Sequence, residues 1–353
     1  MQVALGIIEG FYGKPWSWAA RAETAAFLAP HGYRFYIYAP KSDAFLRERW
    51  QEDHPRDEAE HLRMFAARCR ELGVRFGIGL SPFEAYRDFD RTARAALVRK
   101  LKFFGDIGVD DLAILFDDMK GDVPALAEKQ IDIVHWIAER MEAKRLIVCP
   151  TYYSDDTVLD RVFGARPQNY LEEFGARLDP TIDVFWTGAE VCTREFSNGH
   201  LDRICHLLGR KPVIWDNYPV NDGKRMSQYL HLRAVTGRPA SIANYIAAHA
   251  INPALQPTLS RIPALSLAES YAKGDAYEYG RAFEAAAVAV AGPKLGEMLR
   301  QDLLWLNDSG LDRLEGAAER LRKRYAEMDH PAAQEVVAFL DGAYRYELVA
   351  PTS

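Results

Sequence analysis

Short apolar runs alternate with longer helix-like stretches along most of the chain. Eight runs stand out: Val3–Ile8, Tyr33–Tyr38, Val74–Leu80, Leu112–Phe116, Arg145–Val148, Ile182–Trp186, Pro212–Trp215 and about Tyr245–Ile251. Short apolar runs of this kind are typical of strands that are buried on both faces, as in a parallel sheet. Since the runs recur at intervals of roughly 30 to 40 residues, they predict a series of strand–helix–strand units.

The stretches between the runs have the residue spacing of amphipathic helices. Examples are Trp18–Leu28, Glu58–Leu72, Thr92–Phe104 and Ala125–Met141. Within Glu58–Leu72, the apolar residues fall three and four positions apart, which places them on one helix face: Leu62, Phe65, Ala66, Cys69 and Leu72. Eight alternating units over about 270 residues favour a closed (β/α)8 TIM barrel over an open doubly wound sheet.

The pattern changes near residue 275. Tyr279–Val290, Leu311–Met328 and Pro331–Leu348 are rich in Ala, Glu, Arg and Leu, and no strand-like run separates them. We therefore predict an α/β fold in two parts, a (β/α)8 barrel over residues 1–275 and a small all-α region over residues 276–353. The helical region either covers the barrel or supplies a homodimer contact, and the sequence pattern leaves both alternatives open.

Composition and charge exclude several classes of partner. The chain has 353 residues, of which 48% are hydrophobic, so it can bury a large core. Its net charge of -6 and its interspersed charges argue against a nucleic-acid partner. The N-terminus has no basic start and contains Glu9, which makes it a poor signal peptide. No run approaches the roughly 18 apolar residues of a membrane span, so we expect a cytoplasmic protein with no membrane partner.

The cysteines and histidines do not have the spacing of a metal site. The four cysteines, Cys69, Cys149, Cys192 and Cys205, form no CxxC pair, and we expect them to be buried free thiols. The nine histidines are scattered without an HxxxH or HExxH motif. We therefore expect neither a metal nor another cofactor.

Two adjacent carboxylates end the most apolar run of the chain. Leu112–Phe116 is followed directly by Asp117 and Asp118. In α/β barrels the active site lies at the carboxyl ends of the strands. Two carboxyl groups held close together there can divide the roles of acid and base between them. The alternative is that one caps a helix while its neighbour is solvated.

Polar and aromatic residues also follow the other runs. They are Gly10, Lys41, Tyr152, Tyr153, Trp186, Trp215, Asn217, Asp222 and Asn252. Each has an alternative structural interpretation: a surface lysine, core aromatic residues, or turn-forming Asn and Asp. For Glu9 we favour a structural ion pair with Lys41 or an arginine. Amides, carboxylates and indole rings that converge on one pocket are typical of a carbohydrate site.

The ordered motifs EGFYGKPW, YAPK, LFDD, CPTYY, WTG, WDNYPVND and NP resemble the catalytic barrel of glycoside hydrolase family 84. This family contains O-GlcNAcases and bacterial β-N-acetylglucosaminidases. The resemblance covers roughly residues 3 to 272. It implies a retaining, substrate-assisted mechanism in which the 2-acetamido group of the substrate forms an oxazoline and no protein nucleophile attacks.

The resemblance also implies a role for each matched residue. Asp117 would accept the acetamido N–H, Asp118 would be the general acid and base, and Tyr153 would bind the acetamido oxygen. The remaining residues would bind the sugar: Gly10, Lys41 and Asp222 at its hydroxyls, Asn217 and Asn252 at the acetamide or nearby hydroxyls, and Trp215 as a wall of the acetamido pocket. The implied substrate is a β-linked N-acetylglucosamine glycoside or glycopeptide.

Two alternatives remain at this stage. One is a non-catalytic barrel that binds 2-acetamido sugars. The other is a hydrolase or transglycosidase for a different 2-acetamido sugar.

Overall fold

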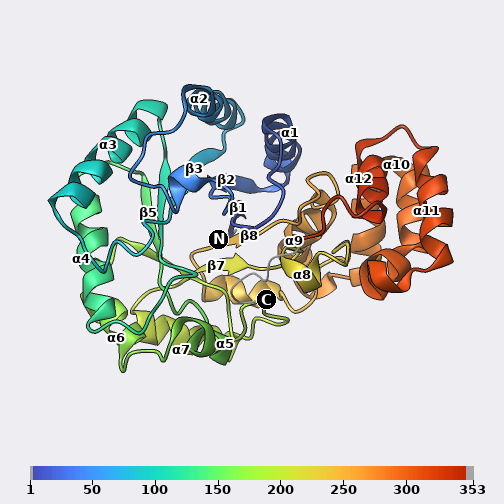
Figure 1. The fold of residues 1–353 in the computed structure, drawn as a ribbon. Helices are drawn as coiled ribbons and strands as arrows, with labels where there is room; N and C mark the ends of the chain where they lie inside the picture. The colour runs from blue at the N-terminus through green and yellow to red at the C-terminus, as the bar shows by residue number, and fades with distance from the viewer. Residues whose placement is uncertain (1–2, 347–353) are drawn as a thin grey trace.

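Eight parallel strands form a closed barrel in the computed structural model, which describes residues 3–346 (Figure 1). Each strand pairs with the next along the chain, and the first pairs with the last. The strands are β1 (Ala4–Glu9), β2 (Tyr33–Tyr38), β3 (Arg75–Leu80), β4 (Asp111–Leu115), β5 (Arg145–Cys149), β6 (Asp183–Trp186), β7 (Val213–Asp216) and β8 (Ala248–Ile251). Because all strands run in the same direction, their carboxyl ends meet at one rim.

Helices follow the strands and surround them (Figure 1). They are α1 (Trp18–Leu28), α2 (Arg56–Glu71), α3 (Arg91–Ile107), α4 (Leu126–Ala138), α5 (Thr157–Phe163), α6 (Tyr170–Arg177), α7 (Asn198–Leu208), α8 (Gly223–Met226) and α9 (Arg261–Lys273). The hydroxyl of Ser17 caps α1 by accepting a hydrogen bond from Ala20 N. In α2 the buried face contains Leu62, Phe65 and Cys69, so the face predicted from the spacing is confirmed.

The predicted barrel is confirmed, and all eight predicted strands are present. Their boundaries shift by one residue at most except at β8, which begins at Ala248. The preceding residues Ala240–Asn244 instead form a 3-10 helix, and Tyr245 donates its N–H to Ile242 O to close that turn.

The C-terminal region is helical, as predicted, but its helices differ in extent. They are α10 (Tyr279–Gln301), α11 (Gly316–Ala326) and α12 (Pro331–Leu340), with a π-helical turn at Trp305–Ser309. The helix α10 is longer than predicted and is broken at Gly292, whose φ of 77° precedes Pro293. The end of the predicted segment Pro331–Leu348, residues 347 and 348, lies outside the described residues. The same holds for residues 1 and 2 of the predicted barrel part and for residues 347–353 of the predicted helical part.

The C-terminal helices dock on the barrel side that carries α9 (Figure 1). One apolar cluster contains barrel residues such as Ile262 together with Ala282, Leu295 and Val336 of the C-terminal region. A main-chain hydrogen bond from Leu230 N to Leu306 O, at 2.9 Å, adds to this contact. The division at residue 275 and a homodimer through these helices stay predictions.

Among residues 3–346 no helix combines the length and the apolar character needed to cross a membrane. In the same range, no group of three or more His, Cys, Asp and Glu side chains is placed to hold a metal ion. All four cysteines are free thiols, as predicted. Cys69 and Cys149 are buried, but Cys192 is exposed, because it lies in a loop beyond the end of β6 rather than in the core.

Two buried ion pairs hold strand ends to neighbouring segments, one to helix α1 and the other to the loop that precedes the 3-10 helix Ala240–Asn244. Glu9, at the end of β1, accepts hydrogen bonds from Arg21 Nη2 at 2.7 Å and from the hydroxyl of Tyr36 at 2.8 Å. The expected structural role of Glu9 is thus confirmed, with Arg21 as its partner. Asp216, at the end of β7, binds Arg238 Nη2 at 2.7 Å and lies 3.0 Å from His249 Nε2.

The ionised form of Asp216 is stabilised by these contacts. Burial alone would raise its pKa, but the charge of Arg238 and the hydrogen bonds from His249 and Arg238 outweigh burial and lower the pKa to about 2. Since the folded-state pKa lies below the ordinary value, Asp216 stabilises the fold at pH values above its unfolded-state pKa. This contribution is lost as the pH falls towards 2.

We expect Asp216→Asn to lower the free energy of unfolding by about 3 to 5 kcal/mol, because Arg238 is left buried without its carboxylate. Urea unfolding at neutral pH measures this loss. The stability of the variant should also fall less steeply than that of the wild type as the pH decreases, because the variant has no Asp216 carboxylate to protonate. Asp106→Asn is the matched control, because its ion pair with Lys102 is exposed to solvent and should contribute below about 1 kcal/mol. Equal losses of unfolding free energy in the two variants would contradict the stabilising role assigned to the buried Asp216–Arg238 pair.

Candidate active site

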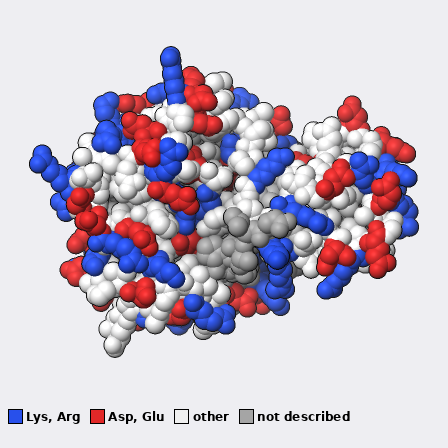
Figure 2. All heavy atoms as spheres, in the orientation of Figure 1, with Lys and Arg blue, Asp and Glu red and all other residues white. Residues whose placement is uncertain are grey.

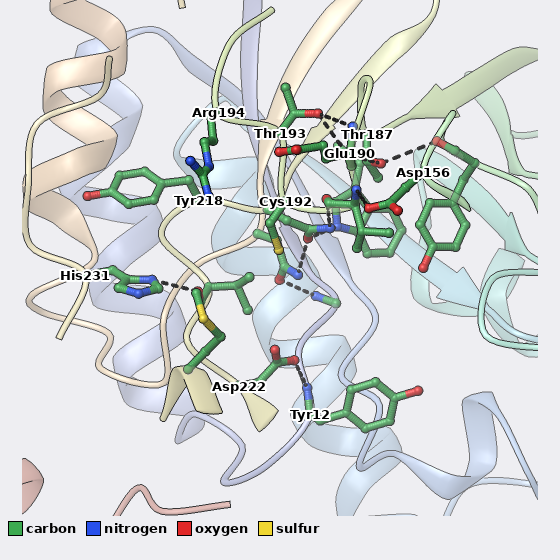
Figure 3. A pocket seen from close by; sticks show the side chains of 18 of the residues that line it. Tyr12, Asp156, Thr187, Glu190, Cys192, Thr193, Arg194, Tyr218, Asp222 and His231 are labelled. Atoms are coloured by element: carbon green, nitrogen blue, oxygen red, sulfur yellow. Dashed lines mark hydrogen bonds between the residues drawn. The ribbon is translucent and has the colours of Figure 1, made fainter. Parts of the chain in front are cut away.

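A cavity of about 770 Å³ opens at the rim where the strands end (Figure 3). Its walls come from the segments after β1, β2, β4, β5, β6, β7 and β8 and from the C-terminal region. The structure brings all nine predicted site residues together in this cavity: Gly10, Lys41, Asp117, Asp118, Tyr153, Trp215, Asn217, Asp222 and Asn252. Their roles stay predictions, but their common location removes the alternative of nine unrelated turn or surface residues.

Asp117 and Asp118 face the same cavity because the backbone changes direction between them. In an extended strand, neighbouring side chains point to opposite faces. Asp118 instead has a φ of 56°, in the left-handed region, which ends the alternation. Asp tolerates this conformation better than most residues do. Both carboxyl groups consequently line the cavity.

Lys41, from the end of β2, lies between the two carboxyl groups. Its Nζ forms an ion pair with Asp117 Oδ2 and lies 3.9 Å from Asp118 Oδ2. The Lys41 side chain is only 3% exposed. Asp117 Oδ1 is also buried, and no donor among residues 3–346 hydrogen-bonds it. A buried acceptor without a donor is costly, so this oxygen is suited to receive an N–H from a ligand.

Three side chains fix the position of Asp118. Tyr12 donates its hydroxyl to Asp118 Oδ2 at 2.7 Å, and Tyr153 donates its hydroxyl to Asp118 Oδ1 at 3.3 Å. Burial and the negative charge of Asp118 raise the pKa of Tyr12 far above its ordinary value, so Tyr12 remains a donor. Arg47, which is 7% exposed, donates from Nη2 to the main-chain oxygen of Asp118 at 3.2 Å.

Amide groups linked by hydrogen bonds form another part of the cavity wall. Asn252 accepts from Gly10 N at 3.1 Å and donates to Asn217 Oδ1 at 3.0 Å. Asn217 Oδ1 also accepts from the indole N–H of Trp215 at 3.0 Å. A Cβ atom on Gly10 would lie 2.2 Å from the Trp215 ring, so only glycine allows this approach. These contacts fix the indole ring as a flat wall of the cavity.

Asp222 lies on another side of the cavity, beside Tyr12 (Figure 3). Its Oδ2 accepts a hydrogen bond from Tyr12 N at 2.7 Å. Desolvation is the main cause that raises the pKa of Asp222, to about 6, and the charge of Asp118 adds to it, while the hydrogen bond from Tyr12 acts in the opposite direction. Asp222 therefore changes its charge near neutral pH.

Three residues that the sequence placed at strand ends do not line the cavity. Glu9 is held by Arg21, Trp186 is fully buried, and Tyr152 donates its hydroxyl to Gly164 O at 2.6 Å. These residues are structural, in agreement with the alternatives considered for Glu9 and Trp186.

Several cavity residues were not predicted. Tyr12 lies inside the EGFYGKPW motif, so the motif itself was the available signal. Tyr218 likewise lies inside the WDNYPVND motif. Others come from the short helix α8, from loops and from the C-terminal region, where no periodic pattern marks them; examples are Cys192, Arg194, Arg225, His231, Arg233, Tyr279 and Asn307.

Known proteins with similar sequences and structures agree on one family. A sequence model of the beta-N-acetylglucosaminidase family matches residues 5–303. The Protein O-GlcNAcase sequences of Mus musculus and Rattus norvegicus are each 30% identical to this chain over 269 residues. These matches cover 70% of this chain but only 29% of either relative.

A solved structure also matches almost the whole chain. It is a point mutant of a Thermobaculum terrenum O-GlcNAc hydrolase, with a TM-score of 0.79 and 26% identity. The match covers 96% of this chain and 80% of that one. Together with the family match over residues 5–303, this places the protein: the chain belongs to the beta-N-acetylglucosaminidase family, glycoside hydrolase family 84.

Proposed function

We propose that the protein is a retaining exo-β-N-acetylglucosaminidase of the O-GlcNAcase type that uses substrate-assisted catalysis. Its substrate would be a β-linked N-acetylglucosamine glycoside or glycopeptide. The observation that carries this proposal is the buried Oδ1 atom of Asp117, which has no donor among residues 3–346 although Lys41 binds the other oxygen. An acetamido N–H supplies the donor that this oxygen lacks.

In the first step, Asp117 would accept the acetamido N–H and so turn the acetamido carbonyl towards the anomeric carbon. The carbonyl oxygen forms a bond to this carbon while the bond to the leaving oxygen breaks, and Asp118 gives its proton to that oxygen. Holding the attacking oxygen close to the carbon makes the displacement intramolecular and therefore faster. The product of this step is an oxazoline ring that still carries the N–H proton, an oxazolinium ion, and the carboxylate of Asp117 would balance its positive charge.

In the second step, Asp118 would act as a base. It takes a proton from a water molecule whose oxygen attacks the anomeric carbon, and the oxazoline ring opens to restore the acetamido group. Two inversions give overall retention of configuration. The hydrogen bonds from Tyr12 and Tyr153 keep the Asp118 carboxyl group directed at the reacting oxygen.

The other cavity residues would bind the sugar. Asp222, Lys41 and Gly10 line the cavity and would contact ring hydroxyls, and Asn217 and Asn252, which also line it, would contact the acetamide or a neighbouring hydroxyl. The Trp215 ring would enclose the acetamido methyl group. Such an enclosed methyl group contributes about 1 to 3 kcal/mol of discrimination against a sugar that lacks it.

The direct test is hydrolysis of an aryl β-N-acetylglucosaminide by the purified protein. We expect the sugar product to form first as the β-anomer and a thiazoline analogue of the oxazoline to inhibit competitively. Proton nuclear magnetic resonance during the reaction identifies the first anomer. A trapped glycosyl ester on the protein, or sugar binding without turnover, would exclude the proposed mechanism.

Asp118→Asn should separate substrates by their leaving groups. General acid catalysis contributes about 100- to 10,000-fold, and a poor leaving group depends on it most. We therefore expect kcat/KM to fall by about that factor for a glycopeptide but far less for an activated aryl glycoside. The matched control is Asp122→Asn, because Asp122 is exposed and does not line the cavity. Equal losses with both substrates would remove Asp118 from this role.

The pKa of Asp222 predicts the acidic limb of the pH profile. Since Asp222 is protonated below about pH 6, it loses its negative charge there and binds sugar hydroxyls less strongly. We expect kcat/KM to rise as the pH increases through 6. Asp222→Asn should remove this limb and lower kcat/KM by about 10- to 100-fold, as expected for a hydrogen bond to a charged group. A limb that persists unchanged in the variant would disprove the assignment to Asp222.

A further inference from the structure

The cavity extends beyond the nine predicted residues towards the C-terminal helices. We call this part the outer compartment and define it by Arg194, Tyr218, Arg225, His231, Arg233 and Tyr279, all of which line the cavity. Figure 3 shows Arg194, Tyr218 and His231 to one side of Cys192, away from Asp156. The whole cavity has the size of a site for a ligand larger than one sugar ring. A glycoside bound at Asp117 and Asp118 can therefore extend into it.

Four of the six residues that define the outer compartment are held in place by contacts with one another: Tyr218, His231, Arg233 and Tyr279. The rings of Tyr218 and His231 stack with centroids 5.7 Å apart. Tyr218 donates its hydroxyl to Arg233 O at 2.8 Å, and Arg233 Nη1 donates to the hydroxyl of Tyr279 at 2.7 Å. Because these side chains are ordered before a ligand arrives, little entropy is lost when one binds.

His231 adds no charge to these walls. Burial lowers its pKa, so the ring is neutral at pH 7. Its Nδ1 lies 2.8 Å from Val220 O and 3.0 Å from Pro219 O, which assigns the proton to Nδ1. The charge of the outer compartment is thus set by its three arginines.

Two of the cations that line the cavity are not neutralised by a carboxylate. Lys41, Arg233 and Arg238 form ion pairs with Asp117, Asp308 and Asp216. In contrast, the side chains of Arg194 and Arg225 form no hydrogen bond or ion pair with any other residue in the described range 3–346. Both are exposed at the mouth of the cavity. Guanidinium groups that have no carboxylate partner of their own attract and bind carboxylates.

Basic side chains also gather on the surface near this compartment, although the exposed Glu190 lines the same cavity. Helix α8, which carries Arg225, lies where the barrel meets the C-terminal helices (Figure 1). Figure 2 shows Lys and Arg side chains gathered along that junction, whereas acidic and basic side chains are interspersed over the rest of the face. A negatively charged group is therefore favoured at the compartment before it makes any direct contact.

We propose that the outer compartment binds an aglycone that carries a carboxylate, and that Arg194 and Arg225 select it. This inference rests on the proposed hydrolase function, because the aglycone is the leaving group of that reaction. The carboxylate belongs either to an acidic residue beside an O-linked N-acetylglucosamine in a peptide or to an acidic sugar linked to N-acetylglucosamine. Both supply the same planar anion to a guanidinium group.

The test compares pairs of substrates that differ only in charge. The first pair is an O-GlcNAc serine peptide with flanking Glu residues and the same peptide with Gln. The second pair is a β-N-acetylglucosaminyl uronic acid and its neutral sugar counterpart. We expect kcat/KM to favour the acidic member of at least one pair by about 4- to 25-fold, and the preference to decrease as salt screens the exposed charges.

The variants Arg194→Gln and Arg225→Gln should each lower this preference about two- to fivefold, which corresponds to one exposed ion pair. Lys224→Gln is the matched control, because Lys224 is the exposed neighbour of Arg225 on α8 but does not line the cavity. The readout is the ratio of kcat/KM for the acidic and neutral members, so a general loss of activity cancels.

The outcomes distinguish the two proposals. A preference for the acidic member in only one of the two pairs identifies the source of the carboxylate. It also supports the proposal that the outer compartment binds this carboxylate. Equal turnover of the acidic and neutral members of both pairs would disprove selection by Arg194 and Arg225. So would a preference for the acidic member that survives in the double arginine variant. Either result leaves the proposed hydrolase function intact. If no glycoside is hydrolysed, the proposed function fails, and calorimetric binding of the two peptides still decides whether the arginines select the acidic one.

Discussion

The site depends on one buried lysine that pairs with one of two adjacent carboxyl groups and lies close to the other. Asp117 and Asp118 follow β4, and Lys41 follows β2, so their ion pairs cross β3. Without Lys41, two like charges would repel each other in a region of low dielectric constant. With it, Asp117 keeps one oxygen engaged and the other open to a ligand. The closed barrel is what brings the lysine to the carboxylates, since no local segment contains all three.

Much of the fold was predictable because a parallel barrel leaves a regular signal. Strands buried on both faces must be apolar along their length, and the helices between them must bury one face. The common location of the nine predicted site residues was predictable for a related reason: they lie at or after the ends of these strands, and barrel closure brings all strand ends to one rim. Lys41 and Asn252 are 211 positions apart but line the same cavity.

The remaining features depend on tertiary contacts that have no periodic signal. The left-handed turn at Asp118 determines that both carboxylates share a cavity, and no spacing rule indicates it. Arg47 is a loop residue whose role follows only from its contact with the main chain of Asp118. Tyr279 and Arg233 meet because the C-terminal helices dock beside the barrel. The break in α10 follows from Gly292 and Pro293. The predicted helix ended at Val290, just before this break, whereas α10 continues to Gln301.

The docking of the C-terminal helices adds a second part of the chain to the wall of the cavity. The nine predicted site residues come from the barrel, whereas Tyr279 and Asn307, which line the same cavity, come from the C-terminal region. Under the proposed function, mutations in the C-terminal region can therefore reshape the wall that meets the departing group without changing the residues proposed to act on the sugar. Evolution, or a laboratory exchange of this segment between relatives, has a route to new targets that preserves the chemistry.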